Sequence, residues 1–115
     1  NINMSKRDDL IQKYAAQLSE AGVDVDHDLL KKVTIGLGPS IYNADAATVS
    51  GSDPKAFETV KNKYLIKKLG MNDGPELDEA IDRAITTLGK SNRNKYRAAV
   101  YYLLCRDFKR ESVYQ

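Results

Sequence analysis

Apolar residues recur at intervals of three and four positions along most of this chain, which is the spacing of one face of an α-helix. The first such segment covers about residues 6–21, and four more follow it. No stretch alternates apolar and polar residues as a half-buried strand would. The apolar positions of the five segments are Leu10, Ile11, Tyr14, Ala15 and Leu18; Leu29, Leu30 and Val33; Phe57, Val60, Tyr64 and Leu65; Leu77, Ile81, Ala84, Ile85 and Leu88; and Tyr96, Ala99, Val100, Leu103 and Leu104.

Residues that start and stop helices flank these segments. Glycines at positions 22, 36, 38, 70 and 89 mark the expected ends. Pro39 predicts a short turn of helix over residues 39–43. The expected starts are Asp24 or Asp26 for the second helix, Asp53 followed by Pro54 for the third, Pro75 for the fourth, and Ser91 or Asn92 for the last.

Five helices and one short helical turn predict an all-α fold, a compact bundle or irregular array of helices. A length of 115 residues suits one domain with one core. We assign residues 4–115 to this domain and residues 1–3 to an N-terminal extension or added residues. The expected core is Leu10, Tyr14, Leu18, Leu29, Val33, Phe57, Val60, Tyr64, Leu77, Ile81, Leu88, Val100 and Leu104.

The composition of the chain indicates where in the cell the protein is expected. Cys105 is the only cysteine, so the chain cannot form an internal disulfide, and we expect a cytoplasmic protein. A buried, apolar role for Cys105 is favoured over a reactive thiol. No apolar run approaches the ~20 residues needed to cross a bilayer, and the early charges at Lys6, Arg7 and Asp8 do not fit a secretory signal. We therefore expect no membrane association.

Charge is divided unevenly between the two halves of the chain. Residues 1–53 carry five Lys and Arg against eight Asp and Glu, whereas residues 54–115 carry thirteen against eight. This asymmetry fits an anionic partner. It fits equally well an attraction between the two halves of one fold.

Several sequence segments resemble a known family. They read SKRD at 5–8, KVTIGLGPSIYNAD at 32–45, LIKKLG at 65–70, DGPELDEA at 73–80 and KSNRNKYR at 90–97. Together they are similar to a bacterial family of unknown function, domain of unknown function 2853, over nearly the whole chain. The resemblance implies a helical bacterial domain and supplies no functional residues.

The sequence lacks the residue patterns of the common metal-binding and nucleotide-binding sites. One His and one Cys cannot supply the four nitrogen and sulfur ligands of a zinc site. The stretch DVDHD at 24–28 opens like a calcium loop, but Leu29 and Ile35 stand where that loop needs Gly and Glu. These acids are better explained as caps of the second helix. No nucleotide-binding glycine motif occurs, so we expect no metal and no cofactor.

The most unusual loop lies at residues 36–45 and is the first candidate for a ligand site. Two glycines permit close backbone approach, and proline fixes the turn that follows. The alternative is a purely structural bend with Tyr42 packed over the core. The candidate binding residues are Gly36, Gly38, Ser40, Tyr42, Asn43 and Asp45.

A second candidate is a nucleic-acid surface on the last helix. Arginine beside an exposed tyrosine can bind phosphates and stack on bases. The alternative is a solvated face that is neutralised by the acidic helix at residues 75–88. The candidate residues are Lys90, Arg93, Asn94, Arg97 and Tyr101.

The sequence thus favours a non-enzymatic cytoplasmic interaction module that binds a protein partner or a small ligand near the loop at 36–45. Weak nucleic-acid binding is the alternative. An enzyme built on Tyr42, Asp45 and His27 is a more remote one, because no motif ties a nucleophile to His27. Homodimer formation stays open, since symmetric association is common among soluble proteins.

Overall fold

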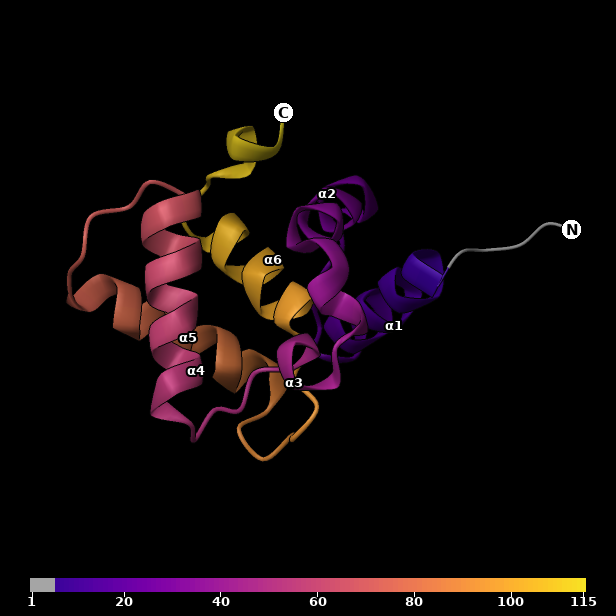
Figure 1. The fold of residues 1–115 in the computed structure, drawn as a ribbon, viewed down its shortest axis with the longest axis horizontal. Coiled ribbons are helices and arrows are strands. Elements are labelled where there is room, and N and C mark those ends of the chain that lie inside the picture. Colours follow the sequence, from indigo (N-terminus) through magenta and orange to yellow (C-terminus); the bar gives the residue numbers. More distant parts are fainter. Residues whose placement is uncertain (1–5) are drawn as a thin grey trace, which may run out of the picture.

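A computed structural model describes residues 6–115, and its elements are helices joined by loops (Figure 1). The predicted all-α class is confirmed. Within the described residues the backbone forms no strand, only an isolated bridge between Thr48 and Tyr96. The proposed extension at residues 1–3 falls outside them. In chain order the elements are α1 (Lys6–Glu20), α2 (His27–Leu37), the 3₁₀ helix η1 (Gly38–Tyr42), α3 (Ala44–Ala47), α4 (Pro54–Thr59), the π-helix η2 (Val60–Lys68), α5 (Pro75–Leu88), α6 (Arg97–Asp107) and the 3₁₀ helix η3 (Glu111–Tyr114).

The central element is α6, which contacts α1, α2, α3, α5 and η2 (Figure 1). Because neighbours cover it on several sides, α6 is buried around most of its circumference rather than along one stripe. Tyr101, expected on an exposed face, is only 6% exposed. The prediction of an amphipathic last helix is therefore wrong on this point.

The predicted core is confirmed at every position except two. Leu10 and Phe57 are half-buried and pack against the edge of the core, whereas the other predicted residues are buried. Cys105 is also buried, as expected. No helix of residues 6–115 is both long enough and apolar enough to span a membrane.

Local side-chain chemistry explains several helix ends. The Asp26 carboxylate accepts a hydrogen bond from the Leu29 N–H at 3.1 Å, and Asp53 accepts one from the Lys55 N–H at 3.0 Å. α2 runs through Gly36 and stops at Gly38, whose φ of 64° favours glycine. The break predicted at residues 36–38 is therefore confined to Gly38.

α4 continues into η2, which has a wider turn than an α-helix. Its last bond runs from the Leu69 N–H to the Tyr64 carbonyl at 2.8 Å, five residues back. This turn keeps Val60, Tyr64, Leu65 and Leu69 together on one buried face. The sequence predicts these apolar positions but not the wider turn.

Candidate functional site

The loop predicted as a ligand site, residues 36–45, is divided among three helical elements: the end of α2, η1 and the start of α3. Ser40 is half-buried in η1, and its hydroxyl donates to the Leu37 carbonyl at 2.8 Å. Asn43 caps α3, because its side-chain oxygen accepts from the Asp45 N–H at 2.8 Å. Tyr42 is 53% exposed, so it does not pack over the core as the structural alternative proposed.

The predicted basic stripe does not lie on one helix. Because α6 begins only at Arg97, Lys90, Arg93 and Asn94 belong to the loop before it. A start at Ser91 or Asn92 is therefore wrong. The Asn92 side chain instead accepts from the Asn94 N–H at 2.9 Å, which favours a turn over a helix.

A cavity of about 380 Å³ brings parts of the two predicted sites together. It takes Gly36 and Ser40 from the first site, and Arg97 and Tyr101 from the second. The other candidates, Gly38, Tyr42, Asn43, Asp45, Lys90, Arg93 and Asn94, do not line it. The lining residues are Val33, Gly36, Leu37, Ser40, Ala46, Thr59, Lys63, Tyr64, Lys68, Arg97, Tyr101 and Tyr114.

Tyrosines form one wall of this cavity. The rings of Tyr64 and Tyr101 stack with centroids 3.8 Å apart at an interplanar angle of 12°. The hydroxyls of Tyr64 and Tyr114 lie 2.9 Å apart, which ties η2 to η3. Burial raises the pKa of both tyrosines, to about 12 for Tyr114. The hydroxyls of Tyr64 and Tyr114 therefore stay neutral near pH 7 and form hydrogen bonds without carrying charge.

Cationic side chains border the same cavity. Arg97 is held by the α3 region, where its Nε donates to the Ala46 carbonyl at 2.6 Å. The Lys68 ammonium lies 5.2 Å from the centre of the Tyr114 ring, and Lys63 also lines the cavity. No carboxylate is among the lining residues, although Asp45 and Asp53 line an adjoining hollow. In the sequence alone, Lys63 and Lys68 are typical of solubilising residues beside an apolar stripe.

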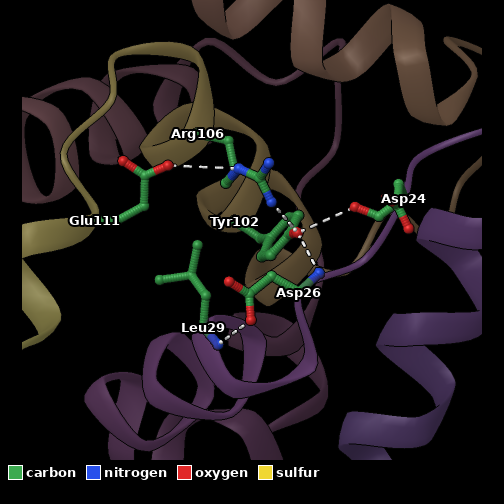
Figure 2. Close-up of polar contacts among 6 residues, drawn as sticks. All are labelled: Asp24, Asp26, Leu29, Tyr102, Arg106 and Glu111. Carbon is green, nitrogen blue, oxygen red and sulfur yellow. Dashed lines mark hydrogen bonds and ion pairs between the residues drawn. The ribbon is translucent and has the colours of Figure 1, made fainter.

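A second polar cluster surrounds the hydroxyl of Tyr102 (Figure 2). This oxygen accepts from the Asp26 N–H at 2.7 Å and from an Arg106 Nη at 2.8 Å, and it donates to the Asp24 carbonyl at 3.5 Å. Arg106 also pairs with Glu111 at 3.4 Å. The Tyr102 hydroxyl thus uses its one donor and both acceptor positions within the fold, so this cluster joins α6 to the α1–α2 linker and to η3 and leaves the hydroxyl no free group for a ligand.

A third hollow, about 820 Å³, lies between residues 50–52 and 90–95. Lys95 lies at its base and is only 1% exposed. Its ammonium donates to the carbonyls of Gly89, Lys90 and Asn92, and burial lowers its pKa. All three ammonium protons thus have main-chain acceptors, which leaves none for a ligand.

In the described part of the chain, no three His, Cys, Asp or Glu side chains lie close enough together to hold a metal ion. The acids that resemble a calcium loop have a structural role, since Asp26 caps α2. His27, named in the remote enzyme alternative, is exposed at the first position of α2 and is not among the residues lining the cavity.

The fold and the cavity together define a small all-α protein with a tyrosine-walled, cation-bordered hollow between α2, η2 and α6. The family model for proteins of unknown function, DUF2853, matches residues 13–112. The chain therefore belongs to the DUF2853 family, as its resemblance predicted. No curated protein matches the sequence.

Proposed function

We propose that this protein is a non-enzymatic binding module and that it holds a small molecule with an apolar body in the cavity between α2, η2 and α6. The observation that carries this proposal is the wall formed by Tyr64, Tyr101 and Tyr114 beside aliphatic side chains. Ligand sites are typically mostly apolar with a few placed polar groups, and occupy roughly 300–1,000 Å³. The cavity's volume of about 380 Å³ falls in this range.

The setting we propose is the bacterial cytoplasm. Its support is the family resemblance in the sequence together with Cys105, which is buried and unpaired. A thiol of this kind needs no oxidising compartment. The same location would give the cavity access to soluble metabolites.

A pair of matched alanine variants tests the ligand site. Ala46 and Ala47 are neighbours in α3 and both half-buried, but only Ala46 lines the cavity. Ala46→Phe should fill the space, whereas Ala47→Phe should leave it open. Phenylnaphthylamine, a neutral apolar fluorophore, is the probe, and its fluorescence reports binding to the folded protein.

We expect the wild type to bind this probe saturably at one site. Ala46→Phe should weaken binding at least about tenfold, equivalent to ~1.4 kcal/mol. Ala47→Phe should stay within about twofold of wild type, with melting temperatures recorded to confirm that both variants fold. Absence of saturable binding by the wild type, or equal loss in both variants, would overturn the proposal.

A further inference from the structure

The charged side chains that line the cavity are all positive. Lys63, Lys68 and Arg97 line it, and no Asp or Glu does. Among residues 6–115 the ion pairs that form involve other cations, so none of these three forms an ion pair with a carboxylate. Lysine and arginine gathered at a partly enclosed site raise the local positive potential and attract an anion.

Arg97 is fixed in position before any ligand arrives. Its Nε donates to the Ala46 carbonyl at 2.6 Å, one Nη donates to the Tyr101 hydroxyl at 3.3 Å, and the other to the Thr48 carbonyl at 3.5 Å. A guanidinium has five N–H donors, so two remain, one on each Nη. A pair of this kind matches the two oxygens of a carboxylate or a related oxyanion.

The neighbours that hold Arg97 are neutral. Main-chain carbonyls and a tyrosine hydroxyl orient the guanidinium without cancelling its charge. Arg83, by contrast, pairs with the Asp107 carboxylate at 2.9 Å. Arg97 therefore combines a fixed geometry with a charge that no ion pair among residues 6–115 engages, although Asp45 and Asp53 line the adjoining hollow that Arg97 also borders.

A long polyanion fits this site poorly. Tyr64 and Tyr101 are only 3% and 6% exposed, so each presents a small part of its ring to the cavity and no full ring face on which a base could stack. Lys90 and Arg93, which would extend a basic track, line a different hollow. The geometry is that of a site for a small molecule.

From these observations we infer that the ligand is an organic anion whose carboxylate or comparable oxyanion binds Arg97 while its apolar body lies against the tyrosine wall. Lys63 and Lys68 then act as additional positive charges along the cavity. This inference rests on the proposed function, and it adds the charge of the ligand and the residue that recognises it.

Two fluorophores that differ by one charged group test the inference. Anilinonaphthalene sulfonate carries a sulfonate, and phenylnaphthylamine is the same ring system without it. Arg97→Gln removes the guanidinium, and Arg93→Gln is the matched control outside the cavity. Binding of each probe is measured by fluorescence titration at low salt and at about 0.5 M salt, where charge interactions are strongly screened.

We expect the wild type to bind the sulfonate more tightly than the neutral probe, with the advantage reduced by salt. Arg97→Gln should weaken sulfonate binding at least about tenfold and leave the neutral probe within about twofold, whereas Arg93→Gln should change neither. If Arg97→Gln fails to fold, the double variant Lys63→Gln with Lys68→Gln should show the same selective loss.

The results that would contradict the anion inference differ from those that would contradict the proposed function. If the wild type binds both probes equally, or if Arg97→Gln weakens both equally, the inference about the anion is wrong while the cavity remains a ligand site. If neither probe binds the wild type, the proposed function itself is wrong.

Discussion

Lys95 shows how one buried side chain can decide the course of a loop. Its ammonium binds three carbonyls between residues 89 and 92, and its side chain is almost completely enclosed. Two effects oppose each other here. Burial of the charge costs free energy, whereas charge-assisted hydrogen bonds contribute roughly 1.5–3 kcal/mol each.

Replacing the lysine should nevertheless be unfavourable, because its single ammonium serves three main-chain acceptors. Lys95→Met should lower the free energy of unfolding by about 1–3 kcal/mol, since it leaves carbonyls without a donor. The matched control is Lys90→Met, an exposed residue of the same loop, with an expected change within about 0.5 kcal/mol. Urea unfolding measures both. A more stable Lys95→Met would show that the cost of burying the charge dominates.

At the scale of elements, the Tyr102 hydroxyl connects three parts of the chain (Figure 2). It joins α6 to the linker before α2, and through Arg106 and Glu111 it reaches η3. Tyr102→Phe should therefore lower the free energy of unfolding by about 1–2 kcal/mol, because two donors lose their acceptor.

The control for this prediction is Tyr42→Phe, whose ring is 53% exposed, and we expect a change within about 0.5 kcal/mol. Thermal or urea unfolding compares the two variants. Equal stabilities of Tyr102→Phe and wild type would show that water replaces the lost hydroxyl and that this cluster does not hold the elements together.

The helical elements could be predicted from the sequence, but the start of α6 could not. Periodicity and caps locate α2, α4 and α5 within a few residues. Before α6, the same residue types that cap helices form a turn, because Asn92 bonds to Asn94 and Lys95 draws the carbonyls of residues 89–92 inward. Such competition between side chains and the main chain has no periodic signal in the sequence.

At the scale of the whole molecule, the cavity could be predicted only in pieces. Gly36 and Ser40 are marked by unusual backbone residues, and Arg97 and Tyr101 by charge beside an aromatic ring. That α2, η2 and α6 bring them to one cavity depends on packing between distant segments. Lys63 and Lys68 look like ordinary surface lysines until the fold places them on its border.

Stability of the whole protein should fall as pH rises above about 10. An unfolded tyrosine has a pKa of 10.0, whereas burial raises the pKa of Tyr14 and Tyr114 to about 12 and that of Tyr64 as well. Above pH 10 the unfolded chain has released protons that the folded chain retains, so the free energy of unfolding decreases.

The buried Lys95 acts in the opposite direction, because its lowered pKa makes the folded chain release a proton first. Three tyrosines should outweigh one lysine. Urea unfolding at pH 8, 9, 10 and 11 measures the net effect of these groups on the free energy of unfolding. Constant or rising stability between pH 9 and 11 would contradict the assignment of these tyrosines as buried and neutral.

The central claim is that the cavity between α2, η2 and α6 is a ligand site. Its most direct test is a titration of isotope-labelled protein with anilinonaphthalene sulfonate, followed by amide chemical shifts in two-dimensional NMR spectra. We expect the largest shifts to saturate together and to cluster at Gly36, Ser40, Thr59, Lys63, Arg97 and Tyr114. Shifts that are centred on the loop of Lys90 and Arg93, or that are scattered over the surface without saturation, would contradict it.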